Sequence, residues 1–526
     1  MIGPRSANLP HDRRWLAPFL VGLVALGLTR IALLPGLAYW DTAELQAVGP
    51  LLGTAHPTGF PTYVLVGWLA SVVLQPFGDP AFRMNLLAAL CVALAAGVTV
   101  DLTRVLTRST ALGVLAGIGL AGTPIVWKIG THAETHALHL ALLVILVWTL
   151  VAWERRRSDR MLVAAVVVFG LSVGNHSLTL LLVPAIGAYV LAVQPDILRR
   201  WRFVLVGVGV LSLTIALVYL ELPLRAGPFR APLVYGRPET WEGFWYVVSG
   251  AQFRGSLVGP FQDLDRKALE LVARTVDAFG PLAPLLPLGF AATARRWPRY
   301  ALLSGLATVT TALFAGSYVN ADIGRYYVGP VLFAWTWLAI LAAVVVDAVQ
   351  AALRGADESG GRPEVDELAM PKAALPGSPF PRGALTVVAA AVLLIPSIVA
   401  GPGRLAALDR SQDRDARGWV ERTLATLAPE AVVVSWWSYS TSLWYVQRVE
   451  GRRLDVEIVD DRTRLDQDLG DVTDVIDANL PTRPVYVIRE DADQLARLAD
   501  RYLLQALDPD GRSGLARVIG RREAGR

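Results

Sequence analysis

Cysteine and charge are both scarce in this sequence of 526 residues. Cys91 is the single cysteine and lies in an apolar run, so a disulfide framework and a thiolate metal site are both excluded. Charged residues make up only 18% of the chain, hydrophobic residues make up 54%, and the mean hydropathy is +0.45. This balance is not that of a soluble domain, so the lipid bilayer is the expected solvent for most of the chain.

The basic residues fall in short clusters between apolar runs. The formal net charge is only +4, and the arginines do not line one continuous face, which argues against nucleic acid as a partner. Clusters of this kind are typical of the cytoplasmic loops of membrane proteins. They occur at residues 104–108, 155–160, 199–202 and 295–299.

Apolar runs long enough to cross a membrane recur over the first 400 residues. A helix needs roughly 20 apolar residues to cross about 30 Å of hydrocarbon, and we predict an α-helical multi-pass protein of about eleven spans. A cytoplasmic N-terminus places all four arginine clusters inside, and the expected location is the plasma membrane of a bacterium. The predicted spans are 15–37, 82–106, 111–127, 138–153, 161–173, 177–193, 203–222, 281–292, 301–317, 327–349 and 385–400.

The chain changes character near residue 402. Beyond it charges occur throughout, and strand-like runs at 431–434, 456–459 and 485–488 alternate with helical patterns such as 491–507. We predict a membrane domain over residues 1–401 and a small extracytoplasmic α/β domain over 402–526. Residues 354–383 are rich in Gly, Pro, Ser and Glu, which predicts a cytoplasmic linker within the first domain.

Reactive side chains are densest in the loop after the first predicted span. Asp41 and Glu44 are three residues apart and share a face if the segment is helical. Asp41 as an N-cap is the alternative interpretation. The stretch around His56 is rich in Pro and Gly, which is typical of a turn. A turn does not need the chemistry of a histidine, so a purely structural role is the alternative for His56.

A second polar group, residues 131–139, holds three histidines and Glu134. On a helix, His132 and His136 would be one turn apart, a spacing that suits a divalent metal. The run is not His-Glu-x-x-His, because Glu134 lies midway between the histidines. The run therefore does not establish a cofactor, and a divalent metal is kept as the alternative. A bound metal would favour a metal-dependent lipid-phosphate hydrolase as the activity.

Several motifs together resemble one known family. The first are Asp41-Thr42-Ala43-Glu44, Ala55-His56-Pro57-Thr58-Gly59-Phe60-Pro61 and Arg83-Met84-Asn85. Further matches are Glu134, Asn175-His176, Pro223-Leu224-Arg225, Asp322 and Arg325-Tyr326. The pattern is similar to the transmembrane-protein-260-like family, also called domain of unknown function 2723. The resemblance extends over nearly the whole chain, and the first loop is its most specific part.

That family resembles the membrane glycosyltransferases of the C superfamily (GT-C), and a eukaryotic member is a protein O-mannosyltransferase. The resemblance implies a GT-C-like fold. It also implies transfer of a sugar, mannose in one branch, from a polyprenyl-phosphate donor to a hydroxyl of a protein, glycan or lipid acceptor on the extracytoplasmic face. Asp41 would be the catalytic base and Glu44 its motif neighbour. The implied substrate-binding residues are His56, Glu134, His176, Arg225, Asp322, Arg325 and Tyr326.

One departure from the family lies in the tail. An acidic, Asn-containing turn is expected after the first tail strand, and this chain has Ser435-Trp436-Trp437-Ser438 there. We expect the two tryptophans to be core residues, with stacking on a glycan as the alternative.

Three arginines in predicted outer loops are candidates for binding the donor phosphate. Arg225, Arg254 and Arg325 carry guanidinium forks that match phosphate oxygens, although each is alternatively an interfacial anchor or the partner of an acid. A transporter or flippase of a lipid-linked or small polar substrate is the alternative to an enzyme. It predicts ionisable residues at mid-membrane, and the predicted spans contain few.

Overall fold

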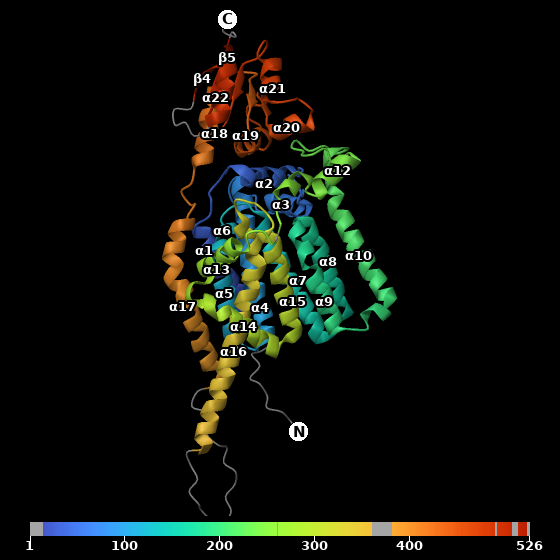
Figure 1. Ribbon diagram of the computed structural model, residues 1–526, viewed down its shortest axis with the longest axis vertical. Coiled ribbons are helices and arrows are strands. Elements are labelled where there is room, and N and C mark those ends of the chain that lie inside the picture. Colours follow the sequence, from blue (N-terminus) through green and yellow to red (C-terminus); the bar gives the residue numbers. More distant parts are fainter. Residues whose placement is uncertain (1–13, 260, 360–380, 490–491, 508–513, 523–526) are drawn as a thin grey trace, which may run out of the picture.

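Long apolar helices form the body of the molecule. The computed structural model describes residues 14–259, 261–359, 381–489, 492–507 and 514–522 (Figure 1). Within these ranges six helical segments are long and apolar enough to cross a membrane, and four shorter apolar helices accompany them. The six are Pro80–Thr107, Thr135–Arg156, Trp201–Ala226, Leu264–Arg296, Ile323–Leu353 and Arg382–Leu408. The predicted α-helical multi-pass architecture is confirmed.

The core of the body surrounds three helices, α4 (Pro80–Thr107), α7 (Thr135–Arg156) and α16 (Val328–Ser359). The apolar window of α7 is 83% buried, so this helix lies at the centre of the bundle. Small residues allow close packing there: a Cβ on Gly119 would come within 2.5 Å of the Trp335 ring. The indole N–H of Trp335 donates to Thr123 Oγ1 at 2.9 Å, so this buried ring is also satisfied as a donor.

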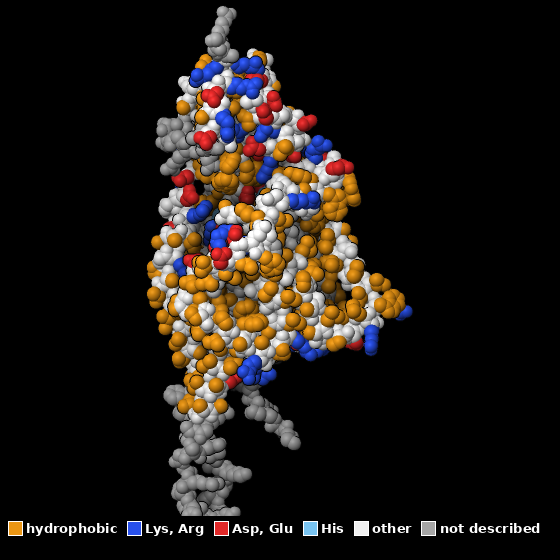
Figure 2. Space-filling model, viewed as in Figure 1, with side chains coloured by type: hydrophobic (Ala, Val, Ile, Leu, Met, Phe, Trp, Pro, Cys, Tyr) orange, Lys and Arg blue, Asp and Glu red, His pale blue; other side chains and the backbone are white. Residues whose placement is uncertain are grey.

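Two apolar helices stand at the edge of the body, α10 (Trp201–Tyr219) and α17 (Arg382–Leu408) (Figure 1). The apolar window of each is only 11% buried, and Leu205, Leu213 and Val399 are among the exposed side chains. Figure 2 shows hydrophobic side chains over most of the visible body, with charges gathered on the tail above it and at its lower end. An apolar surface of this extent belongs in lipid, so the protein is an integral membrane protein.

The remaining helices are shorter or lie between these elements. The 3₁₀ helices carry the label η. Their bounds are α1 (Leu16–Ile31), α2 (Trp40–Leu51), α3 (Pro61–Val73), α5 (Thr110–Gly122), α6 (Pro124–Ile129), α8 (Asp159–Asn175), η2 (Ser177–Leu182), α9 (Val183–Val193), η3 (Ile197–Arg199), α11 (Glu221–Ala226), α12 (Trp241–Val248), η4 (Ala251–Ser256), α13 (Leu264–Phe279), η5 (Gly280–Leu285), α14 (Leu286–Arg296), α15 (Pro298–Gly316) and η6 (Ile323–Tyr327).

The tail contains a five-stranded mixed sheet of order β2-β1-β3-β5-β4. The strands are β1 (Val432–Val434), β2 (Glu457–Val459), β3 (Val485–Val487), β4 (Tyr502–Ala506) and β5 (Ala516–Arg521). The central strand β1 is parallel to both β2 and β3, while β5 is antiparallel to β3 and β4. The helices of the tail are α18 (Asp415–Thr426), α19 (Trp437–Arg448), α20 (Asp461–Asp466), α21 (Val472–Asn479) and α22 (Ala492–Arg501). The predicted α/β character of the tail is confirmed.

One helix prediction in the tail is wrong over its last third. The expected helix 491–507 stops at Arg501, and residues 502–506 form β4 instead. Pairing with β5 buries Tyr502, whose hydroxyl donates to Asp477 Oδ1 at 2.7 Å, and this tertiary contact outweighs the local helical pattern.

Most of the predicted linker 354–383 lies outside the described residues, so the linker stays a prediction. The domain boundary near residue 402 also stays a prediction.

Tail and body meet through α19 and α2. Ala43 and Ala47 of α2 share one buried apolar cluster with Leu443 and Val446 of α19. Residues far apart in the sequence therefore pack at the end of the bundle that lies beneath the tail (Figure 1).

Candidate active site

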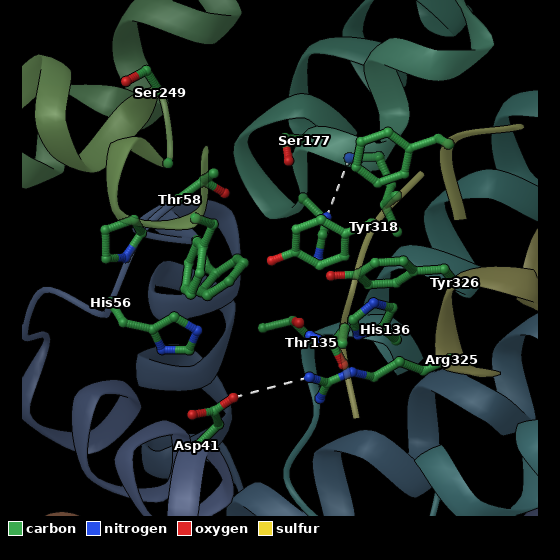
Figure 3. Close-up of a pocket in the computed structure, with 18 of the residues that line it drawn as sticks. Asp41, His56, Thr58, Thr135, His136, Ser177, Ser249, Tyr318, Arg325 and Tyr326 are labelled. Carbon is green, nitrogen blue, oxygen red and sulfur yellow. Dashed lines mark hydrogen bonds and ion pairs between the residues drawn. The ribbon is translucent and has the colours of Figure 1, made fainter. Parts of the chain in front are cut away.

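Two cavities lie at the end of the bundle that faces the tail. The smaller has a volume of about 270 Å³, and the larger about 650 Å³. Asp41, His56, Glu134 and Arg325 line both of them, so these side chains stand where the cavities meet. Figure 3 shows Asp41 and Arg325 facing each other across the smaller cavity. Four of the residues predicted from the sequence therefore meet at one place in the fold.

Asp41 lies in the first turn of α2, and its two carboxylate oxygens face different groups. The N-cap position belongs to Tyr39, so the interpretation of Asp41 as an N-cap is wrong. Its Oδ1 accepts a hydrogen bond from Trp437 Nε1 at 2.8 Å, and its Oδ2 lies 4.0 Å from Nη2 of Arg325. The side chain remains 37% exposed, so a substrate in either cavity can reach the carboxylate.

Glu44 lies on the same helix and holds His56. One carboxylate oxygen of Glu44 accepts the backbone N–H of His56 at 2.8 Å, and the other pairs with the ring Nδ1. Glu44 is 2% exposed, so its contact with substrate is limited, and its visible role is to fix the position of the His56 ring.

The surrounding charges set the protonation states of the Asp41 carboxyl and the His56 ring. Burial raises the pKa of the Asp41 carboxyl, but the charge of His56 and the hydrogen bond from Trp437 outweigh burial and hold that pKa below its ordinary value. Burial lowers the pKa of the His56 ring, but the carboxylates of Glu44 and Asp41 outweigh it and raise that pKa above its ordinary value. Asp41 is therefore an ionised carboxylate at neutral pH.

Glu134 and Arg325 form the opposite wall. Glu134 is the N-cap of α7; its Oε2 accepts from Arg325 Nη1 at 3.0 Å and its Oε1 pairs with His136 Nδ1 at 2.8 Å. Burial raises the pKa of Glu134, but Arg325 and His136 hold it well below its ordinary value. Tyr326 stacks on the His136 ring with the centroids 5.3 Å apart. The ion pair and the stacked rings give this wall a fixed geometry.

Two further predicted residues line the smaller cavity. His176 caps η2 by accepting the backbone N–H of Leu178 at 3.2 Å through Nδ1. Arg254 of η4 donates to Ser249 Oγ at 3.1 Å. Both are therefore placed where a substrate can be contacted.

The other two predicted residues lie outside the smaller cavity. Asp322 lines only the larger of the two cavities, where it pairs with Lys128 at 2.8 Å. Arg225 lines neither: its Nε donates to the carbonyl of Leu52 at 2.7 Å and its Nη2 to that of Leu51 at 3.3 Å. Arg225 therefore caps the C-terminal end of α2.

The described residues include no group of three or more His, Cys, Asp or Glu side chains that can hold a metal ion. The spacing argument for His132 and His136 does not apply, because α7 begins at Thr135 and leaves His132 in the preceding loop. Burial lowers the pKa of His132 to about 4, so this ring is neutral at ordinary pH.

Sequence reasoning missed two tail residues of the site. Trp437, expected in the core, contacts Asp41, and Arg462 places its guanidinium carbon 3.0 Å from the centroid of the Trp437 ring and 4.3 Å from that of Tyr235. Both also line the larger cavity. The feature of the sequence that could have pointed to Trp437 is the departure from the family pattern at residues 435–438.

Comparison with known proteins bears on this arrangement. Residues 41–197 match the family model described as the N-terminal domain of protein O-mannosyl-transferase TMEM260. The predicted family resemblance is confirmed over these residues. Protein O-mannosyl-transferase TMEM260 from Mus musculus is 32% identical over 216 residues, which is 39% of this chain and 29% of the mouse protein. The matched residues 41–197 are called the TMEM260-like segment below, and they include Asp41, Glu44, His56, Glu134 and His176.

Solved structures match the fold over almost the whole chain. ArnT from Cupriavidus metallidurans, solved with undecaprenyl phosphate bound, has a TM-score of 0.58 and 15% identity, and the match covers 96% of this chain and 98% of ArnT. The archaeal oligosaccharyltransferase AglB from Archaeoglobus fulgidus, in complex with an inhibitory peptide and a dolichol-phosphate, has a TM-score of 0.52 and 15% identity. That match covers 85% of this chain and 65% of AglB. The TMEM260-like segment is therefore part of a chain with the GT-C fold.

Proposed function

We propose that this protein is a membrane glycosyltransferase that moves a sugar from a polyprenyl-phosphate donor to an acceptor hydroxyl, with Asp41 as the base. The observation that carries the proposal is the position of the Asp41 carboxylate at the junction of two cavities, facing Arg325. A transferase must bring two substrates together at one base, and two cavities that meet at a carboxylate suit that task.

The smaller cavity suits the lipid-phosphate donor. Phe60, Phe253 and Phe314 give it apolar walls, while Arg254 and Arg325 bring positive charge. The Arg325 Nε and the His136 Nε2 are buried and have no hydrogen-bond partner among the described residues. Guanidinium N–H groups match phosphate oxygens, so Arg325 is the best-placed group to bind the phosphate. ArnT binds undecaprenyl phosphate and AglB a dolichol-phosphate, which supports the same donor class here.

The larger cavity suits the acceptor. It extends from Asp41 toward the tail and is lined by charged side chains of both signs, among them Lys128, Asp322, Arg410 and Arg462. Such a lining favours a polar acceptor over a second lipid chain. The mouse relative is named a protein O-mannosyl-transferase, and this makes a protein hydroxyl and mannose the first acceptor and sugar to test.

The transfer step follows from these positions. The acceptor oxygen forms a bond to the anomeric carbon as the bond to the phosphate oxygen breaks, and polyprenyl phosphate leaves with that electron pair. Asp41 is a weak base toward an alcohol, so it takes the acceptor proton late, as the oxocarbenium-like carbon forms. Arg325 stabilises the charge that develops on the leaving phosphate. Without a covalent intermediate, the configuration at the anomeric carbon is inverted.

The sidedness follows the positive-inside rule. The N-terminus and the arginine clusters are assigned to the cytoplasm of a bacterial cell, and the tail and both cavities to the extracytoplasmic face. Residues 402–526 would then form an extracytoplasmic domain that covers the acceptor side.

The test is release of polyprenyl phosphate by the purified full-length protein. A panel of polyprenyl-phosphate sugars, beginning with mannose, is incubated with membrane extract as the acceptor source. Wild type is expected to release lipid phosphate from one donor, and Asp41→Asn is expected to lose release by about 1,000-fold. Asp101→Asn is the matched control, because Asp101 pairs with Arg104 and lines neither cavity. Equal release by wild type and Asp41→Asn would remove Asp41 as the base, and no release from any donor would favour a transporter.

A further inference from the structure

The indole of Trp437 touches the carboxylate that we propose as the base, although it belongs to the tail. Its Nε1 donates to Asp41 Oδ1 at 2.8 Å across 396 positions of sequence. The other oxygen, Oδ2, lies toward Arg325. A carboxylate with one oxygen bound by a fixed donor has a single oxygen left to meet the acceptor proton.

The indole is itself clamped. Arg462 of α20 lies over the Trp437 ring at 3.0 Å and over the Tyr235 ring at 4.3 Å. The ring also meets His56 edge to face, with the centroids 6.0 Å apart. Beneath it, α19 packs on α2 through the apolar cluster of Ala43 and Leu443. The N–H of Trp437 therefore has little freedom to turn away from Asp41.

We infer that Trp437, clamped by Arg462, is a positioning residue that sets the orientation of the Asp41 carboxylate, so that the tail completes the active site. This inference rests on the proposed transferase function and adds to it a requirement for the C-terminal residues. The hydrogen bond keeps Oδ1 occupied and leaves Oδ2 for the acceptor proton.

The test compares Trp437→Phe with Trp444→Phe in the full-length protein. Phe keeps an aromatic ring and removes the N–H. Trp444 meets Trp437 edge to face at 5.9 Å and is not a partner of Asp41, so its substitution controls for packing at the same seam. We expect Trp437→Phe to lower kcat about tenfold with KM for the donor nearly unchanged, and Trp444→Phe to stay within about twofold of wild type.

A pH profile separates positioning from a structural role. The hydrogen bond from Trp437 stabilises the ionised Asp41, so its loss is expected to move the acidic limb of kcat/KM to higher pH. Arg462→Lys is expected to show a smaller shift in the same direction, because an ammonium does not stack on the indole as a guanidinium does.

The outcomes distinguish this inference from the function on which it rests. Wild-type transfer together with equal kcat values and equal acidic limbs for Trp437→Phe and Trp444→Phe would overturn the positioning role alone. A loss of kcat in Trp437→Phe with an unmoved acidic limb would also overturn it, since only packing would then be involved. Absence of transfer by the wild type would overturn the proposed function and the catalytic meaning of the contact together.

Discussion

Arg325 and Glu134 form a buried ion pair that joins two distant parts of the chain, with Nη1 of Arg325 3.0 Å from Oε2 of Glu134. The side chain of Glu134 is 6% exposed and that of Arg325 is 19% exposed. The pair fixes one arm of the guanidinium and leaves the other directed at Asp41. A buried pair of this kind is costly to break, because the remaining charge stays buried without a partner.

Replacing Glu134 is therefore expected to affect both stability and activity. Glu134→Gln should lower the free energy of unfolding by about 3 kcal/mol and reduce donor cleavage at least tenfold. Thermal unfolding in detergent and lipid-phosphate release measure the two effects. The control is Glu450→Gln, which breaks a partly exposed pair with Arg417 and should cost no more than about 1 kcal/mol. Equal losses in the two variants would contradict the prediction.

The raised pKa of His56 predicts a pH dependence of stability. A group whose pKa is higher in the folded than in the unfolded state stabilises the fold fully below its unfolded value and loses that contribution as the pH rises through the folded value. The difference in unfolding temperature between wild type and His56→Gln should thus be largest near pH 6 and shrink toward pH 9. A difference that does not change over this range would show that protonated His56 is not stabilised by Glu44 and Asp41.

Asn85 is expected to be a stability determinant of the first loop. It is fully buried; its Oδ1 accepts from Gln46 Nε2 at 2.8 Å and Ala133 N at 2.9 Å, and its Nδ2 donates to the carbonyls of Leu34 and Gly36. Asn85→Leu keeps a similar volume but removes these four hydrogen bonds at a buried site, and should cost about 3 kcal/mol in thermal unfolding.

Asn479 supplies the comparison for that measurement. Its Nδ2 makes one described hydrogen bond, to the carbonyl of Val475, at a partly buried site in the tail. Asn479→Leu should cost about 1 kcal/mol or less. A cost for Asn85→Leu as small as this would mean that the loop does not depend on the Asn85 network.

The contact between tail and body is expected to matter for sugar transfer, and two tyrosines allow it to be tested. The Tyr445 hydroxyl accepts the backbone N–H of Ala81 at 2.9 Å, whereas the Tyr486 hydroxyl accepts that of Ala428 at 3.1 Å within the tail. Each change to Phe removes one hydrogen bond, worth about 1 kcal/mol. Only Tyr445→Phe is expected to lower sugar transfer, because only it loosens α19 from the first turn of α4, on the body. Equal transfer by both variants would separate this contact from activity.

The sequence predicted best what depends on local pattern. Apolar runs predicted the segments that became α4 and α7, and short strand-like runs predicted β1, β2 and β3. Residues 502–506 were predicted wrongly because their strand is created by pairing with β5, a contact that no local pattern contains.

Among the site residues, too, those marked by a sequence motif were predicted and those that depend on tertiary contacts were not. The family motifs singled out Asp41, Glu134 and Arg325, and the fold places all three around the same two cavities. Arg225 shows the limit, since a guanidinium that binds phosphate and one that caps carbonyls have the same sequence signature. Trp437 was out of reach for a different reason: its contact with Asp41 depends on how the tail docks on the bundle.

The 396 positions between Asp41 and Trp437 also set an order of events during synthesis. The ribosome makes and inserts the carboxylate with the first helices, and makes its indole partner only after the last span of the bundle. A nascent or truncated chain can therefore hold Asp41 in the membrane without the contact that orients it. Synthesis of the tail as far as Trp437 is thus built into the assembly of the site, and a chain released before it carries the carboxylate without its indole partner.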